Sequence, residues 1–392
     1  MIDFDFVSPT KIYFGKDKEN ELGKAAKAVG MTNVLLVYGS GRIKSDGLYA
    51  KCVSALEKEG IHYVDFGGVR PNPLAAKVRE GVALAKSYSV DGIIAIGGGS
   101  IIDTAKSIAA AFYYEGDPFD FNLKKAVPTK ALPLGVVLTF ASAGSEASNS
   151  CVIQDDDLKI KQGFNCDLLR PAFAIENPEL TYSVPPYQTA AGISDIIMHS
   201  LERYFCPSDG NELSDEWALD LIRNTIIQGR KVMENPHDYQ ARAAIMLNST
   251  LSHNGLTHLG KKFGFVVHPL EHALSGYKAD ITHGAGVALI YPAWASYVYK
   301  GGVSKFAYFA KRVFDVSSAS EEETAIIGIR SMKEFFTSIG MPATLEEVGL
   351  HKDDIPALVG LASGNGTRVI GCYPQSLDEH DIEKIYSSLL KD

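Results

Sequence analysis

The sequence lacks several features that would mark it as a secreted, membrane or nucleic-acid-binding protein. Its five cysteines are scattered over 392 residues without a CxxC pair, so a disulfide scaffold is not expected. No apolar run reaches the length of a membrane-spanning helix, and the N-terminus shows no secretory signal. A basic excess is also missing, since the net charge is -9. We therefore expect a reduced, cytoplasmic protein that binds neither membrane nor nucleic acid.

What the first half does contain is an alternation of short apolar runs and longer helical patterns. Such alternation predicts βαβ units, and these build a parallel sheet with helices on both faces. Strand patterns cover residues 33–39, 62–69, 92–100 and 132–140, and helical patterns cover residues 48–60, 74–89 and 101–114.

The second half has a different texture, because strand patterns nearly vanish and a 3.6-residue periodicity dominates. Pro185 and Pro186 break the chain at the change. We predict an α/β nucleotide-binding domain over residues 1–185 and an all-helical domain over residues 186–392. A chain of this length fits two domains, and a ligand site is expected in the cleft between them.

Three consecutive glycines, Gly97, Gly98 and Gly99, stand where the third predicted strand meets a helix. Glycines let a backbone approach a ligand, and a helix N-terminus directs N–H groups at an anion. Ser100 is a candidate N-cap, with Asp103 in capping-box position. A plain tight turn is the alternative. Because the GxGxxG fingerprint is absent, the motif predicts a phosphate-bearing ligand without identifying a nicotinamide.

The segment "HPLEHALSGYKADITHG" holds three histidines, His268, His272 and His283. The first two are four residues apart and share a helix face, and a break separates them from the third. A bare pair at this spacing is more often accidental than metallic, by roughly three to one.

A second segment, "GISDIIMHSLERY", supplies two further candidate metal ligands. Asp195 and His199 lie on one face of a largely apolar helical stretch, where burying them unpaired would be costly. A simple Asp–His hydrogen bond is the alternative. Together with His268 and His283 they make a set of three nitrogens and one oxygen. That set suits a borderline divalent ion such as Fe2+, Zn2+, Co2+ or Ni2+.

With these motifs in place, the chain resembles the iron-containing, or group III, alcohol dehydrogenases, and most of all their butanol dehydrogenase and NADPH-dependent aldehyde reductase branch. The resemblance rests on both histidine segments and on five others in the same order. These are "SPTKIYFG", "YGSGRIKSDG", "RPNP", "GGGSIIDTAK" and "AGSEAS". It implies a dehydroquinate synthase-like architecture, with a Rossmann-like sheet domain followed by a helical metal domain. It also implies a nicotinamide cofactor and a homodimer.

The resemblance also assigns roles to residues. The family's metal ligands match Asp195, His199, His268 and His283, and His272 is expected to transfer a proton without binding the metal. Ala143 stands where the family usually has a threonine, so Thr139 and Ser142 are the hydroxyl candidates for cofactor contact. Further cofactor contacts are expected at Gly39, Ser40, Arg42, Gly97, Gly98, Gly99, Ser100, Asp103 and Lys161. Arg42 stands where related sequences often carry serine, so its role is inferred from its chemistry and not from the resemblance.

The expected reaction is hydride transfer between NAD(P)H and a small aldehyde or primary alcohol, with the metal polarising the substrate oxygen. The turn after residue 37 predicts a preference for NADP(H), with some use of NAD(H). No acid that would bind a ribose 2′-OH appears before Asp46, whereas Arg42 suits a 2′-phosphate. The alternatives are a glycerol or polyol dehydrogenase or a sugar-phosphate lyase-like synthase of the same fold, and a non-catalytic metal- or nucleotide-binding protein.

Overall fold

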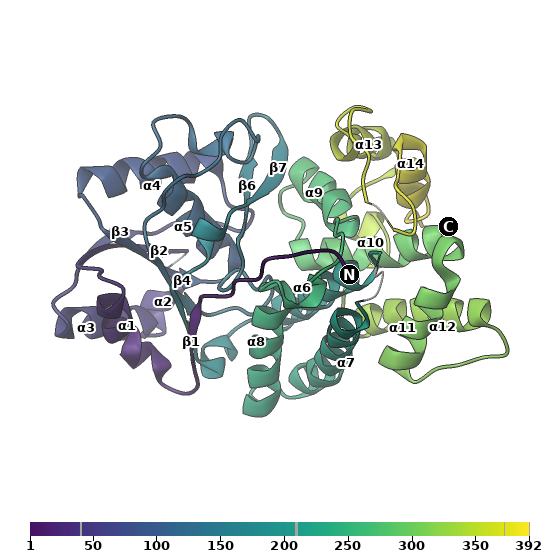
Figure 1. Cartoon of the computed structure of the whole chain (residues 1–392), viewed down its shortest axis with the longest axis horizontal. Coiled ribbons are helices and arrows are strands. Elements are labelled where there is room, and N and C mark those ends of the chain that lie inside the picture. Colours follow the sequence, from purple (N-terminus) through teal and green to yellow (C-terminus); the bar gives the residue numbers. More distant parts are fainter. Residues whose placement is uncertain (40, 208–210, 372, 392) are drawn as a thin grey trace. The chain divides into compact units, whose positions relative to one another are not determined.

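The structure is a computed structural model that describes residues 1–39, 41–207, 211–371 and 373–391 (Figure 1). The chain forms two compact units. One consists of residues 7–183, and the other joins residues 184–392 to residues 1–6. The division into two domains after residue 185, which we infer from the sequence, stays a prediction.

The first unit is built on a six-stranded sheet, counted over the described residues, in which every neighbouring pair is parallel. Its order is β1-β8-β5-β4-β2-β3. The central strands are buried runs of apolar residues, as expected of a parallel sheet covered on both faces. The predicted fold class is confirmed. The strands are β1 (Lys11–Phe14), β2 (Asn33–Tyr38), β3 (His62–Phe66), β4 (Gly92–Gly97), β5 (Leu134–Leu138) and β8 (Phe173–Glu176).

The helices over Leu48–Lys58, Ala75–Ser87 and Gly99–Ala111 follow the strands as the sequence predicts. Two shorter helices, Leu22–Ala28 and Arg42–Ser45, and four strands were not predicted. β1 and β8 are only four residues long, too short for a periodic signal. The other two form an antiparallel hairpin, β6 (Ser150–Asp155) and β7 (Ile160–Asn165), outside the main sheet. The helices are α1 (Leu22–Ala28), α2 (Arg42–Ser45), α3 (Leu48–Lys58), α4 (Ala75–Ser87) and α5 (Gly99–Ala111).

The register of the sheet brings three of its loops to one edge. Tyr38 pairs with Ile96, and Gly97 pairs with Leu138. Strands β2, β4 and β5 therefore end side by side, and the loops that follow them start from neighbouring positions. The carboxyl edge of a parallel sheet is where such folds bind their ligands.

The second unit is helical, with short 3-10 turns between its helices. Local signals start several helices: Asp238 accepts a hydrogen bond from the Ala241 N–H, and Ser320 accepts one from the Glu323 N–H. No described helix is both long and apolar enough to cross a membrane. The helices are α6 (Pro186–Tyr204), α7 (Glu212–Glu234), α8 (Tyr239–His253), α9 (Val267–Tyr277), α10 (His283–Val298), α11 (Val303–Phe314), α12 (Glu321–Ser338), α13 (Ile355–Ser363) and α14 (Glu379–Ser387).

Candidate functional site

The four predicted metal ligands lie on three helices of the helical unit. Asp195 and His199 are one turn apart on α6, His268 is near the start of α9, and His283 is the first residue of α10. Gly284 explains why α10 begins so close to α6. A Cβ atom at residue 284 would lie 2.0 Å from the carbonyl oxygen of Ala191, one turn before Asp195. The missing side chain thus lets the two helices touch where their ligands face each other.

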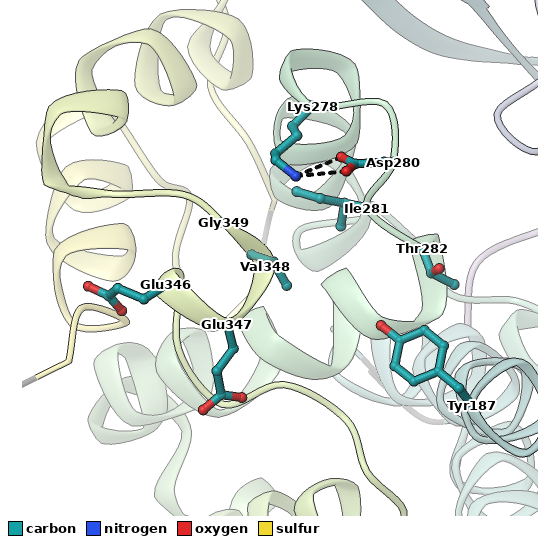
Figure 2. A pocket seen from close by; sticks show the side chains of 9 residues that line it. All are labelled: Tyr187, Lys278, Asp280, Ile281, Thr282, Glu346, Glu347, Val348 and Gly349. Atoms are coloured by element: carbon teal, nitrogen blue, oxygen red, sulfur yellow. Dashed lines mark hydrogen bonds and ion pairs between the residues drawn. The ribbon is translucent and has the colours of Figure 1, made fainter.

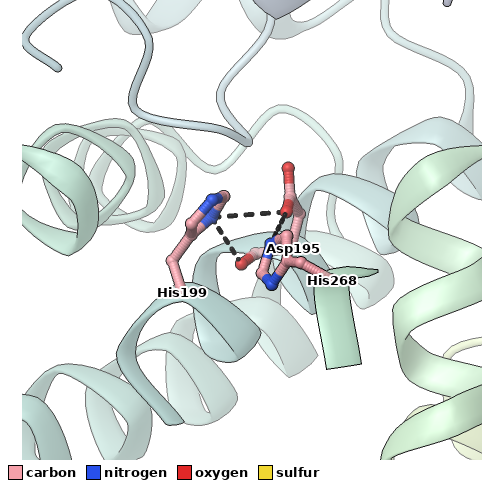
Figure 3. Close-up of side chains that lie close together, drawn as sticks. All are labelled: Asp195, His199 and His268. Carbon is pink, nitrogen blue, oxygen red and sulfur yellow. Dashed lines mark hydrogen bonds and ion pairs between the residues drawn. The ribbon is translucent and has the colours of Figure 1, made fainter. Parts of the chain in front are cut away.

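These side chains converge on one carboxylate oxygen, Oδ1 of Asp195, and Figure 3 shows three of them. Nε2 of His268 lies 3.6 Å from it, and Nε2 of His283 lies 3.7 Å from it. Nδ1 of His199 lies 3.3 Å from the same Oδ1 and 3.0 Å from the backbone carbonyl of Asp195. If that nitrogen donates to the carbonyl, Nε2 keeps the lone pair of the His199 ring.

A divalent ion fits this arrangement. A tetrahedral ion with nitrogen and oxygen ligands at ordinary bond lengths keeps neighbouring ligand atoms about 3.4 Å apart. The distances from Asp195 to Nε2 of His268 and His283 are close to that value. Asp195 Oδ1 and His268 Nε2 are also buried without a hydrogen-bond partner among the described residues. Buried polar atoms normally have partners, so these two point to a group that the chain itself does not provide.

Burial and neighbouring charges shift the pKa values of two of these histidines in opposite directions. Burial, with help from the nearby His253 and His268, lowers the pKa of His199 well below its usual range. Burial also lowers the pKa of His268, but the carboxylates of Glu202 and Asp195 outweigh it and raise this pKa to about 9. His199 is therefore neutral and ready to bind a cation. At His268, a metal ion must displace a proton.

Two buried glutamates beside the cluster were not predicted. A carboxylate oxygen of Glu202 contacts Nδ1 of His268, and one of Glu271 contacts Nδ1 of His283. The spacing of residues in the sequence could have identified both glutamates. Glu202 follows His199 by three residues on the ligand face of α6, and Glu271 follows His268 by three residues on α9.

His272, the predicted proton-transfer residue, lies near the cluster but outside the group that surrounds Asp195. The centre of its ring is 5.5 Å from that of His283 and 6.5 Å from that of His268. It also belongs to a second group, with Glu271 and His283, whose ligand atoms lie within 4.8 Å of one another. The two groups share the neighbourhood of His283, so the structure brings all five predicted residues together.

The glycine run in the α/β unit is explained in part by packing within the chain. A Cβ atom at residue 97 would lie 2.1 Å from Cδ1 of Ile101, and one at residue 98 would lie 2.9 Å from Cβ of Phe140. Residue 98 therefore favours glycine with or without a ligand, whereas at residue 97 the end of the flexible Ile101 side chain would have to move. The N-terminus of α5 begins at Gly99, with Gly98 as its N-cap residue.

The predicted capping box is wrong. Ser100 lies inside the first turn of α5, and no side chain caps this helix. Asp103 instead accepts a hydrogen bond from the Ser145 hydroxyl at 2.6 Å and one from the Val152 N–H at 3.0 Å. The sequence signal failed because the helix starts two residues early, at a glycine. Asp103 thus fastens the loop after β5 to α5.

The other predicted cofactor residues occupy several places in the α/β unit. Gly39 and Thr139 follow β2 and β5 at the edge where Gly97 ends β4, and Ser142 lies further along the same loop as Thr139. Arg42 is exposed on α2 and donates to the Ser183 hydroxyl at 3.0 Å. Lys161 lies on β7 and donates to the side chain of Asn72. Ser40 lies outside the described residues.

The helical unit also has a polar pocket of about 400 Å³ (Figure 2). Tyr187, Lys278 and Thr282 line it together with Glu346 and Glu347. Lys278 forms an ion pair with Asp280 at its edge. Neither Asp195 nor any of the three predicted histidine ligands lines this pocket, although Thr282 directly precedes His283.

Known proteins resemble the chain along almost its whole length. The family model for iron-containing alcohol dehydrogenase matches residues 9–178, and the model for the C-terminal part of the Fe-containing alcohol dehydrogenase family matches residues 189–390. The NADH-dependent butanol dehydrogenase A of Clostridium acetobutylicum is 37% identical over 98% of this chain and 99% of its own length. The NADPH-dependent aldehyde reductase YqhD of Escherichia coli is 31% identical over 97% of both chains.

A solved structure agrees with these sequence matches. The NADH-dependent butanol dehydrogenase A of Thermotoga maritima superposes with a TM-score of 0.96, at 35% identity over 100% of this chain and 99% of that one. The predicted enzyme class, an alcohol or aldehyde oxidoreductase that uses NAD(P)H, is confirmed. The chain belongs to the iron-containing alcohol dehydrogenase family.

Proposed function

We propose that the protein reduces small aldehydes to primary alcohols of the butanol type with NAD(P)H, at a divalent metal held by Asp195, His199, His268 and His283. The observation that supports this most is the convergence of these side chains on Asp195 Oδ1. That oxygen and Nε2 of His268 are buried without hydrogen-bond partners among the described residues. When bound there, a divalent ion, Fe2+ in our proposal, supplies Lewis acidity to a carbonyl oxygen.

The chain's own residues would divide the remaining work. His272 holds the proton that the new alcohol requires, because its ring lies beside those of His268 and His283 without belonging to the ligand set. The glycines and the start of α5 would bind the phosphates of the cofactor. When bound, a reduced nicotinamide would supply the hydride.

We further propose that NADP(H) is preferred and that NAD(H) is used less well. Arg42 is exposed at the start of α2, the helix that follows β2, and no acid follows that strand before Asp46. Relatives of both kinds are known, since butanol dehydrogenases among them are named NADH-dependent and YqhD is named NADPH-dependent. We also propose that the protein is a cytoplasmic homodimer.

The test combines activity with metal analysis on one purified preparation. A panel of straight-chain aldehydes is reduced with NADPH and with NADH, and bound metal is counted in wild type and in Asp195→Ala. The proposal expects aldehyde reduction by wild type only, with one metal ion per chain. Oxidation of glycerol or other diols far faster than of butanol would favour a polyol dehydrogenase instead. Metal binding without any turnover would favour a non-catalytic protein.

A further inference from the structure

Each of the two unpredicted glutamates contacts the Nδ1 atom of a proposed metal ligand. We propose that Glu202 and Glu271 are positioning residues, which hold His268 and His283 with Nε2 directed at the metal, and that Glu271 is not itself a ligand. This inference rests on the proposed metal site. An imidazole that binds a metal through one nitrogen usually donates its other N–H to a carboxylate or carbonyl, and that partner fixes the tautomer and orientation of the ring.

Glu202 does more than contact one ring, because it also closes the start of helix α9. Its Oε1 accepts hydrogen bonds from the backbone N–H groups of Val266 and Val267, the latter at 2.6 Å. Its Oε2 lies 3.3 Å from the backbone nitrogen of His268 and contacts Nδ1 of the same residue. Helix α9 has no side-chain cap of its own. A carboxylate from α6 therefore sets the position of α9 and the orientation of its ligand together.

Glu271 is fully buried on α9 and contacts Nδ1 of His283 at the start of α10. Its place depends on Gly286, because a Cβ atom there would lie 2.7 Å from Cγ of Glu271. The opposite nitrogen of the same ring, Nε2 of His283, faces Asp195 Oδ1 at 3.7 Å. The carboxylate and the metal position thus lie on opposite nitrogens of one ring. This geometry explains why Glu271 and His283 lie together without a metal ion between them.

The two glutamates should respond differently when their charge is removed. In Glu202→Gln, the two backbone N–H groups of Val266 and Val267 hold the amide oxygen, so the amide NH2 turns toward Nδ1 of His268. That nitrogen must then accept a hydrogen bond, which moves the ring proton to Nε2, where the metal binds. A glutamine at residue 271 is able to turn its oxygen toward His283 and keep the correct tautomer. We therefore expect the larger defect in Glu202→Gln.

The experiment measures how fast metal leaves the protein. Wild type, Glu202→Gln and Glu271→Gln are loaded with Co2+, and transfer of the metal to an excess of chelator is followed by the Co2+ absorption bands. Glu19→Gln is the matched control, because Glu19 is an equally buried carboxylate of the α/β unit that contacts Lys51 and Asn177. Release should be about 10-fold faster in Glu271→Gln and about 100-fold faster in Glu202→Gln, with one metal still bound at saturation. The control should match wild type.

The outcomes separate this inference from the proposed function. Release at the wild-type rate from both glutamine variants would overturn the positioning role. If Glu271→Gln bound no metal and lost the Co2+ bands as completely as His283→Ala, Glu271 would be a ligand. If wild type itself bound no stoichiometric metal, the proposed metal site would fail instead. Gly286→Ala provides a second variant, because it displaces Glu271 while keeping its charge; it should also speed release, and release at the wild-type rate would count against the inference.

Discussion

Two buried aspartates, one in each unit, occupy opposite kinds of environment. Both side-chain oxygens of Asp103 have partners on the chain, the Ser145 hydroxyl and the Val152 N–H. Oδ1 of Asp195 has no hydrogen-bond partner among the described residues, yet Nε2 of His268 and of His283 lies within 4 Å of it. A buried carboxylate that the chain satisfies holds structure together. One that the chain leaves facing other ligand atoms indicates a bound cation.

Two buried bases show the same contrast. The ammonium group of Lys106 donates to the backbone carbonyls of Ser148 and Ser150 and to the Ser148 hydroxyl, and burial lowers its pKa to about 8. Nε2 of His268 has no partner among the described residues. Lys106 and Asp103 together fasten the segment that follows β5 to helix α5. Asp103 and Lys106 are thus satisfied within the α/β unit, whereas Asp195 Oδ1 and His268 Nε2 in the helical unit have no hydrogen-bond partner among the described residues.

The largest effect is expected from removing Asp195, whose Oδ1 has no hydrogen-bond partner among the described residues. Asp195→Ala should abolish metal binding and lower aldehyde reduction by about 10³-fold or more, because metal Lewis acidity contributes several kcal/mol. His283→Ala should behave in the same way. Metal content and turnover are measured on purified protein, with Asp103→Ala as the buried aspartate that should retain its metal. Wild-type metal content and turnover in Asp195→Ala would remove this residue from the ligand set.

The second-largest effect is expected from His272, whose ring lies beside those of His268 and His283. His272→Ala should retain its metal and lose about 10²- to 10⁴-fold in turnover, the range expected for a general acid or base. The pH profile of kcat should lose one limb, since the variant lacks the group that supplies the proton. Loss of metal as complete as in His268→Ala would instead make His272 a ligand.

A smaller effect, on stability, is expected from Asp103, whose two side-chain oxygens both accept hydrogen bonds. Asp103→Ala should lower the free energy of unfolding by about 3 kcal/mol, because it leaves a buried N–H and a hydroxyl without their acceptor. Burial raises the pKa of Asp103, against the opposing charge of Lys106. A carboxyl whose pKa is raised by folding stabilises most at acid pH, and its contribution falls as the pH rises through the raised pKa. Urea unfolding at acid and neutral pH, with and without metal, tests this; a loss that appeared only with metal bound would contradict it.

The fold class could be predicted because it rests on periodic patterns, whereas the metal ligand set came from the family resemblance and stays a prediction. The 3.6-residue spacing placed Asp195 with His199 and His268 with His272, and α6 and α9 bear this out. Spacing within one segment says nothing about contacts between segments, so the contacts of Glu202 and Glu271 with the ligand histidines were missed. The capping box failed for a related reason. Asp103 is close to Ser100 in sequence, but its hydrogen bonds go to residues more than forty positions away.

The smallest effect is expected on the choice between NADP(H) and NAD(H). The residue concerned, Arg42, is an exposed base. Arg42 already donates to the Ser183 hydroxyl, so a 2′-phosphate would compete with a weak, exposed hydrogen bond. Arg42→Ala should therefore lower kcat/KM with NADPH by about tenfold, the size of one charge-assisted hydrogen bond, and change the value with NADH little. A wild-type preference for NADH that Arg42→Ala leaves unchanged would contradict the proposed preference.

A carboxylate at the end of β2 should shift the preference in the opposite direction, because it would repel the 2′-phosphate and bind the ribose 2′-OH. Gly39→Asp introduces it, but the site is tight: a Cβ atom there would lie 3.2 Å from the carbonyl oxygen of Val69 and 3.3 Å from Cδ1 of Ile101. Gly39→Ala is therefore the matched control, since it adds the same Cβ atom without the charge. If alanine lowers kcat/KM equally with both cofactors and aspartate lowers it selectively with NADPH, the charge sets the preference. Equal losses with both variants would show that Gly39 is required only for space.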